Sequence, residues 1–352
     1  MSLDRRSFLS GTAAAIGATT LAEQALAKEP PPAKPPTPIS LAASPPPGFT
    51  PFSAPGRVVK VSKAGSLQPN QLFPKADDAK AMLERAMTEL TGKKTLADAI
   101  MMFVHKDDKV CVKPNGIALK NMSTNKELIL PLIEAMIAGG VPAANITVLE
   151  QYPSFLGGTR VTAQNVPAGV KVVTHNNEDA TMAYRMIPGT GVQTKFVRAL
   201  TESTALVNIA LVKDHSICGY TGSLKNMTHG CTINPEDFHL HHAAPQIALL
   251  AAQDVLKSRL RLNITDAFKV MAHGGPLDKL PQYRYPYEAV MVSTDPVAMD
   301  TIGWEIVEEF RKKNRLRTLT EEGRAPSYIK AASDLGLGIA DRAQIQLKEI
   351  TA

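Results

Sequence analysis

Residues 109–150, KVCVKPNGIALKNMSTNKELILPLIEAMIAGGVPAANITVLE, contain the pattern that decides the fold. The apolar run that ends at Lys113 is stopped by PNG at 114–116 and predicts a strand. Apolar side chains then recur at helical spacing over 128–137, and GG at 139–140 ends that helix. A second apolar run over 146–149 predicts the next strand. This order is a βαβ unit, whose two strands pair in parallel through a right-handed crossover.

The alternation of strands and helices continues on both sides of this unit. The segment TNKE at 124–127 matches a capping box and predicts that Thr124 caps the helix. Folding is expected to begin near residues 57–61. Further helices are predicted over 77–91, 245–260 and 296–312, and further strands over 170–173, 205–212, 262–265 and 289–292. The predicted fold class is therefore α/β, with a mostly parallel or mixed sheet flanked by helices. One large domain and two coupled α/β halves both fit a chain of 352 residues.

The first 27 residues have the features of a twin-arginine signal peptide. Arg5 and Arg6 stand in DRRSFLS at 4–10, a weakly apolar Gly/Ala/Thr stretch follows, and ALA at 25–27 is a cleavage pattern. The alternative is a chance pair of arginines on a disordered terminus. We expect the twin-arginine translocase to be a partner during export, and the mature protein to be periplasmic.

The rest of the chain divides into a linker and a domain. Residues 28–56 are rich in proline and lack apolar periodicity, which predicts a disordered linker before an α/β domain over 57–352. No segment approaches the ~20 apolar residues of a membrane span, so we expect no stable membrane insertion after cleavage. Net charge is +6 with scattered basic residues, and aromatic residues make up 5%, so nucleic acid is not an expected partner.

Polar residues follow five of the predicted strands. In open α/β sheets ligands bind beyond the carboxyl ends of the strands, so we expect these five exits to share one pocket. The exits are Lys113 to Asn115, Glu150 to Tyr152, Lys213 to His215, Asp266, and Ser293 to Asp295.

Five motifs resemble, in content and order, those of the bacterial and archaeal family known as domain of unknown function 362, in its subgroup with twin-arginine signals. They are VKPN at 112–115, LVKDH at 211–215, TGSLKN at 221–226, ITD at 264–266 followed by GGP at 274–276, and STDPVAMD at 293–300. The resemblance spans about residues 110 to 305 and implies no general activity. Some relatives append ferredoxin-type modules. Cys111, Cys218 and Cys231 lack the Cys-x-x-Cys spacing, so no four-cysteine iron–sulfur cluster is expected.

Residues 213–242, KDHSICGYTGSLKNMTHGCTINPEDFHLHH, hold five of the eight histidines. Within them, TGSLKN combines a turn, two hydroxyls, an ammonium and an amide, which together suit a carboxylate or phosphate of a small-molecule ligand. The predicted substrate-binding residues are Lys113, Asn115, Lys213, Thr221, Lys225, Asn226 and Asp295. The alternatives are a turn that caps a helix, with Lys225 solvated or paired with Asp214, and Asp295 as a helix cap.

The histidines predict either a metal site or a set of exposed and supporting side chains. The predicted ligands are His215, His229, Cys231 and His239, which suit a single Zn, Fe or Cu ion. Their spacing matches no recognised zinc motif. Cys218 and Cys231 are the pair that a disulfide would join, although folding before export argues against reliance on one.

Two functions from different classes remain open. The first is an enzyme, with or without a metal, that acts on a small polar or anionic molecule. Its predicted catalytic residues are His215, His229 and Asp266. One of the histidines would move a proton or ligate a metal, and Asp266 would orient that histidine. The second is a non-catalytic periplasmic protein that binds a ligand or a metal in the same groove. Convergent His, Lys and Asp side chains with shifted pKa values favour the first.

Overall fold

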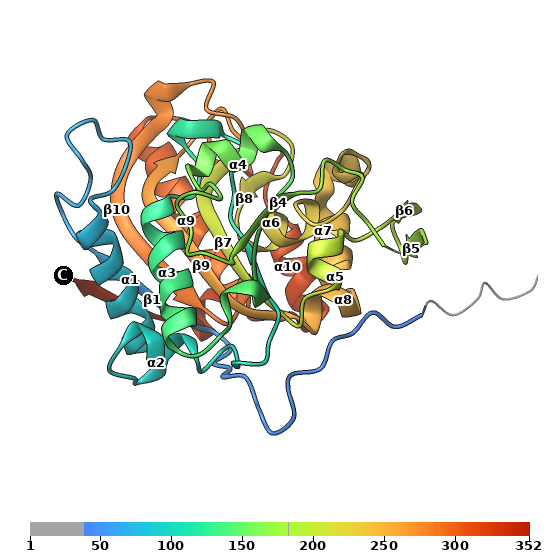
Figure 1. Cartoon of the computed structure of the whole chain (residues 1–352). Coiled ribbons are helices and arrows are strands. Elements are labelled where there is room, and N and C mark those ends of the chain that lie inside the picture. Colours follow the sequence, from blue (N-terminus) through green and yellow to red (C-terminus); the bar gives the residue numbers. More distant parts are fainter. Residues whose placement is uncertain (1–38, 182) are drawn as a thin grey trace, which may run out of the picture. The chain divides into compact units, whose positions relative to one another are not determined.

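The strands pair into a nine-stranded mixed sheet in the order β11-β1-β10-β9-β7-β2-β3-β4, with β8 paired to β7 (Figure 1). The computed structural model describes residues 39–181 and 183–352. The strands of this sheet are β1 (Arg57–Ser62), β2 (Val110–Lys113), β3 (Ile146–Glu150), β4 (Lys171–Thr174), β7 (Ala205–His215), β8 (Gly219–Thr221), β9 (Leu260–Met271), β10 (Arg284–Ser293) and β11 (Gln346–Thr351). A separate hairpin pairs β5 (Arg185–Ile187) with β6 (Val192–Thr194). The predicted α/β class is confirmed. Residues 39–352 form one compact unit built on this one large sheet.

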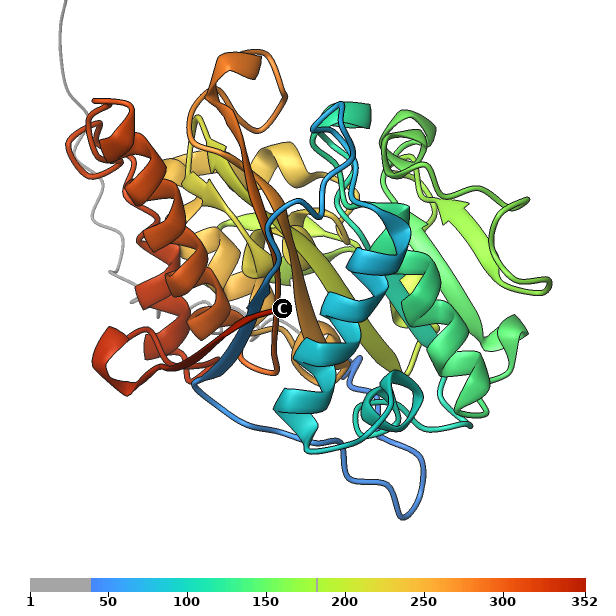
Figure 2. The same cartoon turned by 90° about the vertical axis from the view of Figure 1, so that its left-hand side faces the viewer.

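Helices cover both faces of the sheet (Figure 2). The helices are α1 (Ala76–Thr91), α2 (Leu96–Ile100), α3 (Lys126–Ala138), α4 (Pro153–Thr159), α5 (Arg198–Thr201), α6 (Ser223–His229), α7 (Ala244–Ala251), α8 (Asp254–Lys257), α9 (Pro296–Lys313) and α10 (Tyr328–Asp334). One apolar cluster joins α1, α2 and α3 to the sheet, and a second joins α6, α7, α9 and α10 to the opposite face. Successive residues of a strand pack into different clusters, because side chains alternate between the two faces of a sheet. Val110 and Cys111 of β2 are an example.

The βαβ unit read from residues 109–150 is present as β2, α3 and β3, with Val110 opposite Ile146 in parallel register. The predicted capping box is wrong. The helix begins at Lys126 after Asn125, and no side chain caps it. The Thr124 hydroxyl instead accepts from the Asn115 N–H and donates to the Ile209 carbonyl, so it ties α3 to two strands. The predicted helix over 245–260 is also divided, because Gln253 is extended between α7 and α8.

Strand direction sorts the five predicted polar exits into two groups. Strands β2, β3, β4, β7 and β9 are mutually parallel, so their carboxyl ends lie at one edge of the sheet. Strand β10 is antiparallel to β9, and Asp295 therefore follows a strand that ends at the opposite edge. Strand β9 continues to Met271, which leaves Asp266 inside the strand rather than at its exit.

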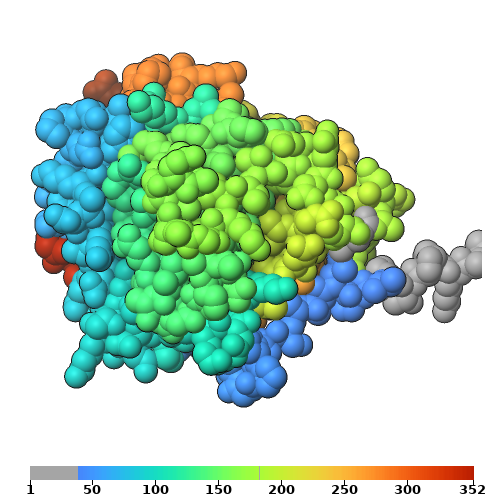
Figure 3. Space-filling view, in the orientation of Figure 1, coloured from blue at the N-terminus to red at the C-terminus, as the bar shows by residue number. Residues whose placement is uncertain are grey.

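The proline-rich segment over 39–56 lies against the domain (Figure 3). Asp254 accepts hydrogen bonds from the N–H of Leu41 at 2.7 Å, and Arg259 donates to the Leu41 carbonyl. Further along, the N–H of Phe52 donates to the Met102 carbonyl at 2.8 Å. The prediction of a disordered linker is therefore wrong for residues 39–56. The predicted signal peptide over 1–27 and the linker over 28–38 lie outside the described residues.

None of the helices within 39–181 and 183–352 is both long and apolar enough to cross a lipid bilayer.

Candidate functional site

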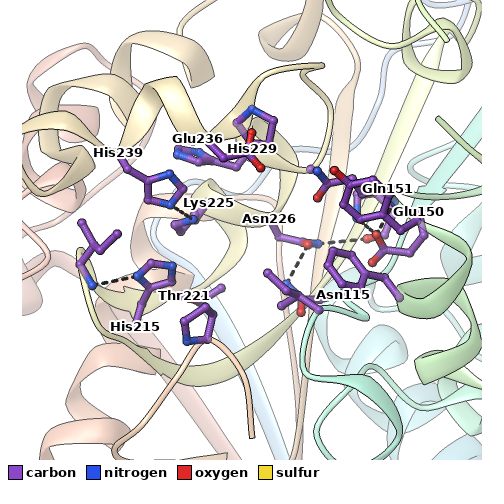
Figure 4. A pocket seen from close by; sticks show the side chains of 18 of the residues that line it. Asn115, Glu150, Gln151, His215, Thr221, Lys225, Asn226, His229, Glu236 and His239 are labelled. Carbon is purple, nitrogen blue, oxygen red and sulfur yellow. Dashed lines mark hydrogen bonds and ion pairs between the residues drawn. The ribbon is translucent and has the colours of Figure 1, made fainter. Parts of the chain in front are cut away.

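A pocket of about 340 Å³ opens at the sheet edge where β2, β3 and β7 end (Figure 4). The helix α6 and the segment Pro235–Ala243 close its other side. Its lining residues are Lys113, Asn115, Ile117, Glu150, Gln151, Tyr152, Phe155, His215, Ser216, Ile217, Thr221, Lys225, Asn226, His229, Gly230, Pro235, Glu236, His239 and Pro276. Three of the predicted exits therefore share one pocket, as expected for the carboxyl ends of parallel strands.

Three buried lysines surround this pocket, and only one of them has a carboxylate partner. Lys113 lies 3.1 Å from Glu150 and also donates to the Pro114 carbonyl. Lys213 is fully buried, and its Nζ donates to Asn115 at 3.2 Å. Lys225 lies 3.1 Å from His239 Nε2. Within the described part of the chain, no carboxylate lies within 4 Å of the Nζ atoms of Lys213 and Lys225.

Burial lowers the pKa values of Lys213 and Lys225, and repulsion from Lys225 lowers that of Lys213 further. Burial, followed by the charge on Lys225, lowers the pKa of Lys213 from 10.5 to about 7. Burial likewise lowers the pKa of Lys225, partly offset by Cys218 and Glu236. The pocket is thus a place where positive charge is costly to keep without a negative partner.

Three imidazoles lie together at the pocket beside Lys225, one pair stacked and the other edge to face. The ring centroids of His215 and His239 lie 5.6 Å apart, and those of His229 and His239 lie 4.8 Å apart. Burial, followed by the charge on Lys225, lowers the pKa of His239 to about 4. The same two causes hold the pKa values of His215 and His229 well below their ordinary value. All three rings are therefore neutral at pH 7.

Hydrogen bonds define different roles for these rings. His215 Nδ1 accepts from the N–H groups of Ile217 and Cys218, so the neutral ring carries its proton on Nε2. His239 Nε2 faces the Lys225 ammonium and accepts from it, as Figure 4 shows. Both ring nitrogens of His229 contact protein groups, the Thr228 hydroxyl and the Phe238 carbonyl. His229 therefore has less freedom to exchange a proton than the other two.

The two predicted amides form a hydrogen-bonded chain in the floor of the pocket. Asn115 accepts from Lys213 and donates to Asn226, and Asn226 donates to Asn208 at 2.7 Å. Asn208 in turn donates to the Ser223 carbonyl. These side chains are engaged with the protein, so their first effect is to orient Lys213 and to join β2, β7 and α6. Thr221, by contrast, lines the pocket, and its buried hydroxyl has no hydrogen-bond partner among the described residues.

Two predicted carboxylates lie outside the pocket. Asp266 accepts from the backbone N–H and the side-chain amide of Asn125 on the α3 side of the sheet, at 2.7 and 2.8 Å. Asp295 caps α9 through Val297 and Ala298, and also accepts from Gly56 and Ile339. Asp266 as an orienting carboxylate and Asp295 as a substrate ligand are therefore wrong, and the alternative of Asp295 as a helix cap is confirmed.

Of the four predicted metal ligands, His215, His229 and His239 line one pocket, whereas Cys231 lies apart from them. Cys231 is fully buried in the apolar core and does not line the pocket. Burial raises its pKa to about 12, which opposes the thiolate that a metal requires. In residues 39–181 and 183–352, no three His, Cys, Asp or Glu side chains are grouped so as to hold a metal ion. Cys111, Cys218 and Cys231 are all free thiols.

Two sets of contacts at the site were not predicted. Glu150 was expected at the pocket as part of a polar strand exit, but its pairing with Lys113 was not predicted. It also accepts from the N–H groups of Gly116 and Gln151. Arg324 donates to Asp214 at 2.5 Å and to the His215 carbonyl at 2.8 Å, which anchors the end of β7. This contact excludes the predicted alternative pairing of Lys225 with Asp214, and nothing local in the sequence indicates it.

The comparisons with known proteins identify a family and a distant structural likeness. The family model described as domain of unknown function (DUF362) matches residues 110–305. The fold resembles that of the lactate racemase apoprotein from Thermoanaerobacterium thermosaccharolyticum, with a TM-score of 0.37 and 12% sequence identity. That likeness covers 72% of this chain and 57% of the other, and nothing about activity follows from it. No curated protein matches the chain. The family match extends over more than half of the sequence and includes the pocket's lysines and its three histidines, and the chain therefore belongs to the DUF362 family.

Proposed function

We propose that the pocket binds a small anionic molecule, and that the protein is an enzyme that transfers a proton to or from it. The observation that carries this proposal is Lys225, a buried lysine that lines the pocket and has no carboxylate partner within the described residues. A buried charge without a partner is costly, and a carboxylate or phosphate supplies that partner on binding. Thr221, whose hydroxyl has no hydrogen-bond partner among the described residues, lines the same pocket.

The neutral imidazoles support proton transfer rather than binding alone. His215 presents Nε2–H as a donor, and His239 presents Nε2 as an acceptor beside Lys225. The two rings are stacked with centroids 5.6 Å apart, so a donor and an acceptor lie together at one wall of the cavity, where general acid and base catalysis can use both. An incoming anion also offsets the repulsion from Lys225, so it raises the pKa values of both rings toward pH 7.

We also propose that the protein acts outside the cytoplasm. The twin-arginine pattern around Arg5 and Arg6 supports export of the folded chain.

The binding step is tested by isothermal titration calorimetry at pH 7 with phosphate, oxalate, pyruvate and acetate. Replacing Lys225 with methionine is expected to weaken binding by about 10- to 100-fold, because one charge-assisted hydrogen bond contributes about 1.5–3 kcal/mol. The matched control is Lys330→Met, since Lys330 is an exposed lysine on α10 that pairs with Asp334. Titration in buffers of different ionisation enthalpy is expected to show proton uptake on binding.

The catalytic step is tested by deuterium incorporation into the bound carboxylates in D₂O, followed by proton NMR. His239→Asn is expected to abolish exchange while binding persists. Anion binding without exchange in the wild-type protein would instead assign a non-catalytic binding protein. If no anion binds, or if Lys225→Met binds as tightly as Lys330→Met, the proposed function is wrong.

A further inference from the structure

We infer that Lys225 is a nucleophile that forms an imine with a carbonyl group of the bound anion, so that the substrate class is small oxo acids. This inference rests on the proposed anion-binding function and deepens it. Anion binding needs only hydrogen bonds and charge pairing, whereas an imine is a covalent bond between Lys225 and the substrate.

The three lysines at the pocket differ in what surrounds each amine. Lys113 is paired with the Glu150 carboxylate, 3.1 Å from its Nζ. Lys213 does not line the pocket, and its side chain is 0% exposed. Lys225 lines the cavity, and the polar neighbour of its Nζ is the ring nitrogen of His239. Among these amines, only that of Lys225 is both open to a ligand and free of a carboxylate in the described structure.

The helix α6 holds Lys225 in a fixed position at the cavity wall. Both oxygens of Asp300 accept from its first N–H groups, those of Ser223 at 2.5 Å and Leu224 at 3.0 Å. Glycine is required at 222, because a Cβ there would lie 2.2 Å from Asp300 Oδ1. The carboxylate and the amide chain from Asn208 therefore position the amine before any ligand arrives.

The neighbouring ring of His239 supplies the proton transfers that imine formation needs. His239 Nε2 takes one proton from the Lys225 ammonium and leaves a neutral amine. The amine nitrogen attacks the carbonyl carbon. The N–C bond forms as the C=O π bond breaks, and one amine proton moves to the oxygen, which becomes the hydroxyl of a carbinolamine. The protonated His239 then returns its proton to that hydroxyl, which leaves as water, and the lysine nitrogen is left double-bonded to carbon as a protonated imine. One amine and one carbonyl thus give one imine and one water, with no oxidant or reductant.

The charge environment favours the reactive form of this amine. Burial lowers the pKa of Lys225, so a larger share of it is neutral near pH 7 than for a lysine in solvent. The imine nitrogen can still carry a proton, and it then lies beside the carboxylate of the bound substrate. That carboxylate supplies the negative partner that the Lys225 ammonium lacks in the empty pocket. The protonated imine also withdraws electrons from the adjacent C–H, which links this step to proton transfer by His239.

The test is reductive trapping of the full mature protein with pyruvate and sodium cyanoborohydride, followed by peptide mass spectrometry. The expected result is one reduced pyruvyl group on Lys225, formed faster than on the exposed control Lys330. Lys225→Arg keeps the positive charge but cannot form an imine. It is expected to bind oxalate and to lose the label at this site. His239→Asn is expected to slow labelling by about 100-fold or more, the usual contribution of a general base.

The outcomes separate this inference from the proposed function. Oxalate binding with no label on Lys225, or with label only in proportion to surface lysines such as Lys330, overturns the imine and leaves the anion site standing. Label on Lys213 instead of Lys225 also overturns the assignment. Failure of oxalate to bind at all overturns the proposed function itself.

Discussion

Replacing Lys213 with methionine is expected to stabilise the fold near neutral pH and to remove a pH dependence that the wild-type protein shows. Lys213 is fully buried, and burial with the charge on Lys225 lowers its pKa from 10.5 to about 7. Between these two pH values the unfolded chain holds a proton that the folded chain has released. Because the unfolded state binds more protons, the free energy of unfolding rises with pH across this window.

The size of the effect follows from the two pKa values. Each pH unit between them corresponds to about 1.4 kcal/mol, so protonation of this lysine costs the fold about 5 kcal/mol below pH 7 and about 4 kcal/mol at pH 7. Methionine fills a similar volume without this cost. It loses the hydrogen bond to Asn115, worth about 1 kcal/mol. The variant should therefore be more stable than wild type by about 3 kcal/mol at pH 7 and about equally stable at pH 10.

Urea unfolding followed by circular dichroism at pH 6, 7, 8.5 and 10 measures this difference, with Lys330→Met as the control for a change at an exposed lysine. Both proteins should keep the same dependence on urea concentration, since the folded structure is unchanged. A difference between Lys213→Met and wild type that stays constant from pH 6 to pH 10 would refute the reasoning. It would mean that Lys213 keeps its proton in the fold through a partner that the geometry does not show.

Three further predictions concern residues outside the pocket. Asp295→Ala removes the acceptor of four backbone N–H groups and should destabilise the fold by about 3 kcal/mol in urea, with oxalate affinity unchanged; weaker oxalate binding would restore it as a ligand. Asp266→Ala should cost about 2 kcal/mol of stability for its lost contacts to Asn125, again without affecting oxalate affinity; lost binding or exchange would return it to the site. Arg5→Lys combined with Arg6→Lys should leave the precursor in the cytoplasm on cell fractionation; normal export of that variant would exclude the twin-arginine route.

The regular elements were predictable because their patterns are local. The helix at 77–91 and the helix that follows Asp295 lie within one residue of α1 and α9, since apolar spacing and a cap residue are read within a few turns. The βαβ unit was equally accessible. The capping box was not, because Thr124 finds partners on β2 and β7, and these compete with the local cap.

The candidate site was predictable only where strand direction agreed with expectation. Lys113 and His215 were expected at a shared edge, and parallel pairing of β2 and β7 places them there. Asp295 follows an equally good strand, but β10 runs antiparallel and carries it to the far edge. A run of apolar residues has no direction, so the sequence cannot distinguish these cases.

By itself the sequence determined that this chain is an α/β protein of the DUF362 family, with lysines and histidines concentrated in the segments around α6. Only the tertiary structure decided which of these side chains meet. It moved Asp266 to another face, enclosed Cys231 in the core, and left Lys225 facing His239 in a cavity. The physical reason is that secondary structure depends on neighbours along the chain. Whether a buried charge is paired depends instead on strand order and direction, and these are set by segments that lie far apart in the sequence.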